Sequence, residues 1–154
     1  MKKLLCCLLV FGLTGGYAQE ITKQYDKIGK FKNGIAVVWK NGHCGIITQA
    51  GKEIVKPVYD KIGVFGNDAI AYTTRDGKMG MINMEGKVIV PNLYEEIGAF
   101  KGSFAITRRN GLCGMINKQG KVLVENKYEK IKIGKHGEIR AVKDGQETIL
   151  DLKN

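Results

Sequence analysis

The sequence predicts an all-β fold built as a tandem array of four β-hairpin repeats, each about 34 residues long. Three observations support this prediction. A tyrosine followed by an acidic residue recurs at nearly constant spacing, and an Asn-Gly or Asp-Gly dipeptide follows each tyrosine. Glycine is also abundant, with 21 residues against only 2 prolines. Many glycines indicate many tight turns and therefore many short elements, which favours strands over helices.

The tyrosine motif marks the start of each repeat. Its four copies are Tyr25-Asp26-Lys27-Ile28, Tyr59-Asp60-Lys61-Ile62, Tyr94-Glu95-Glu96-Ile97 and Tyr128-Glu129-Lys130-Ile131. The successive tyrosines are 34, 35 and 34 residues apart. Because stacked units need the same packing residue once per unit, we interpret the tyrosines as core residues. A row of aromatic and acidic groups that grips a repetitive ligand is the alternative.

Each repeat contains a hairpin. The dipeptides that predict its turn are Asn41-Gly42, Asp76-Gly77, Asn110-Gly111 and Asp144-Gly145. Each lies between two short apolar runs, where Asn-Gly or Asp-Gly is the strongest local signal for a type I′ turn.

A second turn follows each of the first three hairpins and leads into a further strand. It ends in Gly51-Lys52, Gly86-Lys87 or Gly120-Lys121. No helical pattern fits beyond the N-terminal segment, because the apolar runs are short and bounded by glycine. A unit of this size cannot bury its own apolar face, so we expect the four units to stack into one continuous core.

The two ends of the array resemble two parts of one unit. The last hairpin has no following Gly-Lys strand, and residues 20–24 lie where such a strand would precede Tyr25. The array could therefore close into a propeller-like ring or remain an open, solenoid-like stack. The polar run Gln146-Glu147-Thr148 is typical of an exposed cap. We therefore expect the open stack.

The repeat resembles the WG repeat family of bacterial β-repeat proteins. The shared pattern is Tyr-Asp-x-Ile-Gly-x-Phe, a short apolar strand, Asn-Gly-x-x-Gly-x-Ile, and Gly-Lys-x-x-x-x-Pro-x-Tyr, and it covers nearly all of residues 25–151. The Trp-Gly pair of the family is replaced here by Cys44-Gly45, Met79-Gly80, Cys113-Gly114 and Glu147-Thr148. The single tryptophan, Trp39, precedes the first of these pairs. The resemblance implies a β-repeat architecture and an extracytoplasmic or interaction role without a shared enzymatic activity.

Residues 1–18 have the pattern of a signal peptide. Lys2 and Lys3 precede an apolar stretch over residues 4–13, and Gly16-Tyr17-Ala18 is a small-x-small cleavage site. The apolar stretch is shorter than the roughly 20 residues of a transmembrane helix. Leu5 stands before Cys6 where a lipoprotein signal would have a small residue. We expect cleavage near Ala18, one repeat domain over residues 19–154, and a secreted or periplasmic protein without stable membrane insertion.

The chain is basic, with 25 Lys and Arg against 15 Asp and Glu and a formal net charge of +10. Such a charge favours anionic partners, although a solvated lysine-rich surface is the simpler interpretation. Basic residues are densest between Lys118 and Lys143. A candidate anion-binding patch in this region consists of Lys127, Lys130, Lys132, Lys135 and Arg140.

The sequence carries no catalytic or metal-binding motif, so we expect no enzyme activity, metal or cofactor. Ser103, the only serine, is not in a Gly-x-Ser-x-Gly setting. His43 and Cys44 are adjacent, and adjacent strand residues point to opposite faces. We expect Cys44 and Cys113 to be buried thiols, because a disulfide needs Cα atoms within about 7 Å of each other. A dimer linked through one cysteine is the alternative.

These features together predict an exported, non-catalytic binding or scaffolding module of a bacterial cell envelope or secretome. Its β-repeat faces would hold another protein or a cell-surface polymer, and we do not expect nucleic acid as the partner. One alternative is binding of an anionic polymer through the basic region. The other is a surface hydrolase with an unrecognised pair of carboxylates.

Overall fold

The computed structural model describes residues 23–134 and 136–152, and its named elements are all strands. The all-β prediction is therefore confirmed. The chain divides into two compact units, Met1–Val58 and Tyr59–Asn154. The signal peptide predicted for residues 1–18 lies outside the described residues.

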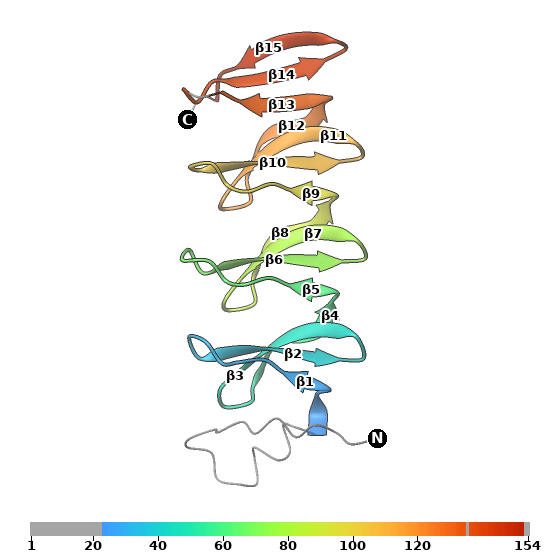
Figure 1. Ribbon diagram of the computed structural model, residues 1–154, viewed down its shortest axis with the longest axis vertical. Helices are drawn as coiled ribbons and strands as arrows, with labels where there is room; N and C mark the ends of the chain where they lie inside the picture. Colours follow the sequence, from blue (N-terminus) through green and yellow to red (C-terminus); the bar gives the residue numbers. More distant parts are fainter. Residues whose placement is uncertain (1–22, 135, 153–154) are drawn as a thin grey trace. The chain divides into compact units, whose positions relative to one another are not determined.

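The first unit contains one antiparallel sheet in the order β1-β2-β3-β4 (Figure 1). Its strands are β1 Lys27–Ile28, β2 Ile35–Lys40, β3 His43–Thr48 and β4 Glu53–Tyr59. Tyr25, Ala36, Val38 and Ile47 form its buried cluster, against which Ile28 and Phe31 pack. The first tyrosine of the repeat motif is thus a core residue.

The second unit contains three antiparallel sheets. The first has β5 Lys61–Ile62, β6 Ile70–Arg75, β7 Lys78–Asn83 and β8 Val88–Tyr94. The second has β9 Glu96–Ile97, β10 Phe104–Arg109, β11 Leu112–Asn117 and β12 Val122–Tyr128. The third has β13 Lys130–Ile133, β14 Ile139–Lys143 and β15 Gln146–Leu150. Each sheet is one repeat, and its elements follow chain order across the sheet.

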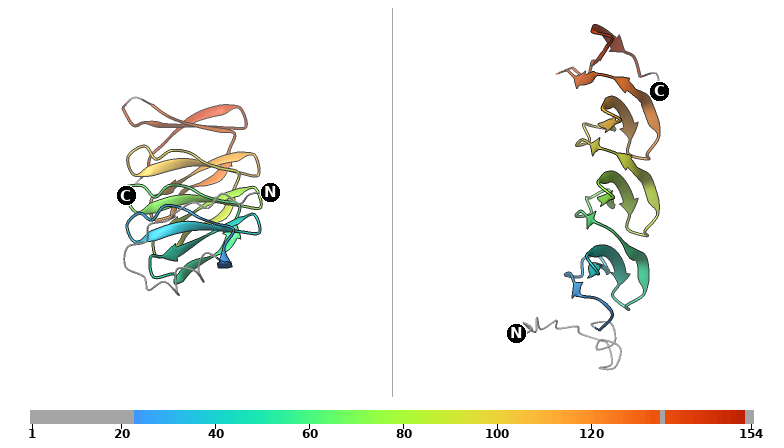
Figure 2. Two further views of the ribbon diagram at one scale, coloured as in Figure 1. Left: turned by 60° about the horizontal axis from the view of Figure 1, so that its bottom comes forward. Right: turned by 90° about the vertical axis from the view of Figure 1, so that its right-hand side faces the viewer.

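The three sheets of this unit stack on one another, as the right-hand view of Figure 2 shows. One buried cluster joins the first two sheets and consists of Met81, Val90, Tyr94, Ile97, Ala105 and Ile116. The next joins the second and third sheets and consists of Cys113, Met115, Val124, Tyr128, Ile131, Ile139 and Ala141. Within this unit, neighbouring repeats therefore bury apolar residues against one another.

The described strands form no closed barrel or ring, which agrees with the expected open stack. The described strands belong to four separate sheets, and within the described residues β15 pairs only with β14.

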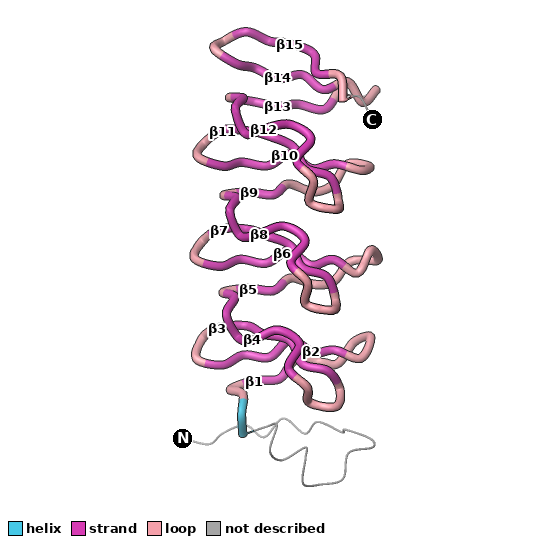
Figure 3. The backbone as a smooth tube through the Cα atoms, turned by 180° about the vertical axis from the view of Figure 1, so that it is seen from behind, coloured by secondary structure: helices cyan, strands magenta, loops and turns pink. Residues whose placement is uncertain are grey.

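The predicted hairpin turns are present between β2 and β3, β6 and β7, β10 and β11, and β14 and β15. Both turn residues have positive φ, for example 52° at Asn110 and 75° at Gly111. This is the type I′ conformation, which Asn and Gly adopt readily. The three hairpin turns of the second unit lie along one of its sides (Figure 3).

Residues 20–24 lie where a strand would precede Tyr25 in the repeat pattern. The two of them that the structure describes, Lys23 and Gln24, have helical backbone.

Candidate functional site

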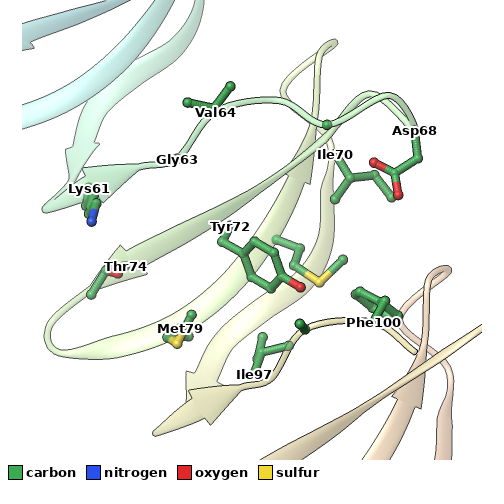
Figure 4. Close-up of a pocket in the computed structure, with 13 residues that line it drawn as sticks. Lys61, Gly63, Val64, Asp68, Ile70, Tyr72, Thr74, Met79, Ile97 and Phe100 are labelled. Atoms are coloured by element: carbon green, nitrogen blue, oxygen red, sulfur yellow. The ribbon is translucent and has the colours of Figure 1, made fainter. Parts of the chain in front are cut away.

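A groove of about 510 Å³ lies in the second unit between the sheet β5–β8 and the beginning of the next repeat. Figure 4 shows Tyr72 and Met79 reaching it from the sheet, and Ile97 and Phe100 facing them from the next repeat. Val64 lies at its edge and is 82% exposed. We call this space the Met79 groove. Its lining is mainly apolar.

The alternation of β6 explains why these side chains line a groove. Successive strand residues point to opposite faces, so buried Ala71 and Thr73 face one way, while Tyr72 faces the groove. The Tyr72 hydroxyl donates a hydrogen bond to the carbonyl oxygen of Gly98 at 3.2 Å. Burial, together with the nearby Asp68 carboxylate, raises the pKa of Tyr72. The phenol therefore stays neutral and ties the sheet to the next repeat.

Met79 occupies the position of tryptophan in the Trp-Gly pair, and the glycine beside it has a steric role. A Cβ atom on Gly80 would lie 2.6 Å from the carbonyl oxygen of Val90 on β8. The same approach recurs at Gly45 and Gly114, each against the strand that follows. Thr148 replaces this glycine in the last repeat, where no strand pairs with the outer edge of β15 among the described residues.

A second groove, of about 380 Å³, lies one repeat later between the sheet β9–β12 and β13. Cys113, which corresponds to Met79, lines it together with Ile106, Ile131 and Ile133. We call it the Cys113 groove. It has four charged lining residues, Glu96, Lys101, Arg108 and Lys130, whereas the Met79 groove has two, Lys61 and Asp68.

In the first repeat, a tryptophan lies next to the Trp-Gly position, on the neighbouring strand. Trp39 on β2 lies directly opposite Cys44 on β3 in the strand register. The ammonium group of Lys27 lies 4.9 Å from the centroid of the Trp39 ring, a cation–π distance. The indole of this repeat therefore stands beside the Trp-Gly position, one strand away from it.

The structure brings together only part of the predicted basic patch. Lys130 and Lys132 lie on one face of β13, and Arg140 on β14 lies opposite Lys132. Arg140 forms ion pairs of 3.2 Å with Glu147 and 3.9 Å with Glu138. Lys127 belongs to β12, a different sheet, and its ammonium lies 5.7 Å from the Tyr128 ring centroid. Lys135 lies outside the described residues.

Cys44 and Cys113 are buried thiols, as predicted. Cys44 is 3% exposed and Cys113 is 4% exposed. The Cys113 sulfur lies 3.7 Å from the carbonyl oxygen of Glu129. The described part of the chain contains no group of three metal-ligating side chains. None of its helices is long and apolar enough to span a membrane.

The acidic residue of the tyrosine motif has a structural role that the sequence analysis missed. The Glu95 carboxylate accepts hydrogen bonds from the backbone N–H groups of Asn110, at 2.9 Å, and Gly111, at 3.0 Å. Asp26 accepts one from the N–H of Asn41 at 2.7 Å. Both carboxylates accept hydrogen bonds from backbone N–H groups of their hairpin turns, which gives these two motif acids a structural role. The available signal was the nearly constant spacing of 15 or 16 residues between the acidic residue and the Asn-Gly or Asp-Gly dipeptide.

The groove residues were also missed. Tyr72, Phe100 and Ile97 occupy ordinary repeat positions, and nothing in their spacing distinguishes them. The available signal was the replacement of tryptophan by smaller side chains at Met79 and Cys113.

The comparison with solved structures finds the crystal structure of the WD40 beta propeller domain of Doa1, with a TM-score of 0.32 and 16% sequence identity. The match covers 72% of this chain and 44% of that one, so this chain spans less than half of that structure's length. Among curated proteins no match is found.

The sequence profile of the family described as "WG containing repeat" matches four consecutive segments, residues 20–43, 45–78, 79–113 and 114–145. The four matches cover most of the chain and agree in number with the four repeats predicted from the tyrosine spacing, although three of them begin at or next to the Trp-Gly position instead of at a tyrosine. The chain therefore belongs to the WG containing repeat family.

Proposed function

We propose that this chain is an exported, non-catalytic binding module that holds a partner protein in the Met79 groove. The observation that carries the proposal is the groove itself, which has an apolar lining at the position where the family has tryptophan. Its volume of about 510 Å³ lies within the range of roughly 300–1,000 Å³ typical of binding pockets.

The chemistry of the groove favours an aromatic or bulky apolar side chain of the partner. Tyr72 and Phe100 offer ring faces and edges, and the sulfur of Met79 makes favourable contacts with aromatic rings. Val64 extends the apolar surface to the rim, where it is 82% exposed. The nearby Asp68 carboxylate forms an ion pair with Lys118 at 3.3 Å, so its charge is partly compensated.

The test uses a variant that fills the groove from within. Met79→Trp restores the Trp-Gly pair and places an indole in the space that the partner would occupy. Proteins captured from envelope extract by the wild-type chain are identified, purified and titrated calorimetrically against wild type and variant. The expected result is one saturable partner whose affinity falls at least about tenfold with Met79→Trp, because its anchoring side chain is excluded.

Val122→Trp is the matched control. Val122 lies on β12, is 40% exposed and lines neither groove. This variant adds the same indole elsewhere, so partner affinity should be unchanged. A partner that binds wild type and Met79→Trp equally would contradict the proposal, as would the absence of any saturable protein partner.

Export is the second part of the proposal and rests on the signal-like pattern of residues 1–18. Expression of the full chain in a bacterial host should yield a periplasmic or secreted protein whose mass corresponds to cleavage after Ala18. Retention of the intact chain in the cytoplasm would contradict the proposal that the protein is exported.

A second candidate is binding of an anionic polymer, favoured by the shared face of Lys130 and Lys132 on β13. If these lysines neutralise polymer charges, retention on heparin should weaken steeply with salt. The variant Lys130→Glu/Lys132→Glu should abolish retention, while Lys52→Glu/Lys56→Glu, which changes two exposed lysines of β4 and its turn, should reduce it only slightly. Equal retention of both variants would remove this candidate.

A further inference from the structure

We infer that the Cys113 groove is a binding site for a small amphipathic carboxylate, a molecule with one acidic group and an aliphatic or aromatic body. This inference does not depend on the proposed protein partner, which concerns the Met79 groove. Its basis is the combination of an apolar floor with a cationic rim in a space of about 380 Å³.

The floor is apolar and comes from two repeats. Ile106 and Cys113 line it from the sheet β9–β12, and Ile131 and Ile133 line it from β13. Cys113 and Ile131 are 4% and 6% exposed, so they are held in fixed positions by the surrounding core. Such a floor accepts the body of a ligand, whose burial supplies most of the affinity.

The rim is cationic. Lys101, Arg108 and Lys130 line the groove, against the single carboxylate of Glu96. Glu96 forms only a long ion pair with Arg108, at 3.8 Å, and both side chains are largely exposed. No carboxylate of the described residues lies within ion-pair distance of Lys101 or Lys130. Two ammonium groups are therefore available to a ligand's acidic group.

The Met79 groove provides an internal comparison, because it occupies the same place one repeat earlier. Gly66 and Thr74 line it where Lys101 and Arg108 line the Cys113 groove. Its charged lining residues are one lysine and one aspartate, Lys61 and Asp68. The excess of positive charge thus belongs to the Cys113 groove and does not follow from the repeat architecture.

The guanidinium of Arg108 adds directionality to the rim. One of its terminal nitrogens donates to the carbonyl oxygen of Gly111 at 3.1 Å, which holds the side chain beside the hairpin turn. Its planar fork suits a carboxylate better than a point charge does. A ligand whose acidic group lies beside Arg108 would place its body over Ile131, while Lys101, whose backbone pairs with Phe104, lies toward the other end of β10.

The probe for this inference is octanoate. It is compared with octanol, which is uncharged, and octyltrimethylammonium, which is positively charged; all three have a linear chain of eight carbon atoms. Calorimetry and amide chemical shifts of the wild-type chain are measured in low salt. We expect saturable octanoate binding with shifts concentrated at Gly98, Cys113 and Ile131. Octanol should bind at least about tenfold more weakly, because the charge contacts are missing. Octyltrimethylammonium should not bind.

Two pairs of variants separate the contribution of the lysine charge to octanoate binding from the contribution of the apolar cavity. Lys130→Glu should weaken octanoate binding at least about tenfold, while Lys127→Glu, outside the groove, should change it less than about twofold. Cys113→Trp should abolish binding by filling the floor, while Met79→Trp should leave it unchanged. Circular dichroism verifies that each variant folds, and the exposed lysine variants still decide the matter if Cys113→Trp does not fold.

Several outcomes would overturn the inference. Equal binding of octanol and octanoate would show an unspecific apolar site, and loss of binding with Met79→Trp alone would place the ligand in the other groove. An unchanged affinity of Lys130→Glu, or no octanoate binding at millimolar concentration, would likewise reject it. Apart from the Met79→Trp outcome, these results do not bear on whether a protein occupies the Met79 groove.

Discussion

The side-chain amide of Asn126 on β12 reaches across its sheet to Thr107 on β10 and donates hydrogen bonds to the polar atoms of this buried residue. Its nitrogen lies 3.2 Å from the Thr107 carbonyl oxygen, 3.1 Å from the Thr107 hydroxyl and 3.1 Å from the Leu112 carbonyl oxygen. Thr107 is 1% exposed. The preceding repeat has the same arrangement between Asn92 and Thr73.

The first repeat replaces this pair with Val38 and Pro57, which predicts a specific rescue. Asn126→Ala leaves the Thr107 hydroxyl and two carbonyl oxygens without their partner, so it should lower the free energy of unfolding by about 1–3 kcal/mol. The double variant Thr107→Val/Asn126→Pro copies the first repeat and should recover most of that loss. Chemical denaturation measures both. A double variant less stable than Asn126→Ala would contradict the interpretation.

Gly114 should not accept any side chain. A Cβ atom there would lie 2.6 Å from the carbonyl oxygen of Val124, so Gly114→Ala must push β12 away from β11. We expect a loss of about 1–3 kcal/mol in the free energy of unfolding. The control is Thr148→Ala at the same repeat position in β15, which should change stability by less than about 0.5 kcal/mol. Equal effects would show that the strand approach is not the cause.

The lowered pKa of the Glu95 carboxyl predicts that the stability of the fold depends on pH. The N–H of Gly111, and in addition Lys78 and the N–H of Asn110, hold the pKa of the Glu95 carboxyl below its ordinary value. A carboxyl with a lowered folded-state pKa stabilises the fold above its unfolded-state pKa, and this contribution is lost as pH falls through the folded-state value.

Glu95→Gln should therefore be less stable than wild type at pH 7, and the difference should shrink as the pH falls below about 4, near the unfolded-state pKa of a glutamate. Denaturation curves between neutral and acidic pH test this. Glu85→Gln, at an exposed turn position, should be indistinguishable from wild type throughout. A difference for Glu95→Gln that stays constant with pH would exclude the carboxylate as the origin.

The burial of Cys44 and Cys113 predicts slow thiol chemistry. In a chain of residues 19–154, a thiol reagent such as dithiobisnitrobenzoate should react with neither cysteine in the folded state, because both are less than 5% exposed. Both should react at once in denaturant. Rapid labelling of one thiol in the folded chain would contradict the buried position and favour the alternative of a cysteine-linked dimer.

Filling the Met79 groove should stabilise the fold. Met79→Trp adds apolar surface against Tyr72 and Phe100, and cavity filling of this kind commonly raises the free energy of unfolding by about 0.5–2 kcal/mol. Val122→Trp, on an exposed strand position, should give no comparable gain. Thermal and chemical denaturation compare the two, and destabilisation by Met79→Trp would mean that the groove cannot accept the indole.

Local sequence patterns are sufficient to predict the repeat and its turns. The spacing of Tyr25, Tyr59, Tyr94 and Tyr128 identifies four units, and the Asn-Gly and Asp-Gly dipeptides locate their hairpins. These features are predictable because a type I′ turn depends on two adjacent residues and stacking requires the same core residue in each unit. The profile matches and the four sheets agree with both.

The candidate site depends on contacts between repeats, which no local pattern records. Lys127 and Lys130 are three residues apart in the chain, yet they belong to different sheets. Lys101 and Lys130 are far apart in sequence, and both line the Cys113 groove.

The sequence by itself thus determined the all-β class, the four units and the basic character of this protein. Only the tertiary structure decided which acidic residues hold the turns, where the missing tryptophans leave space, and which lysines share a groove. The physical reason is that strand pairing and turn type follow from neighbouring residues. Grooves arise where side chains of two stacked sheets fail to fill the space between them.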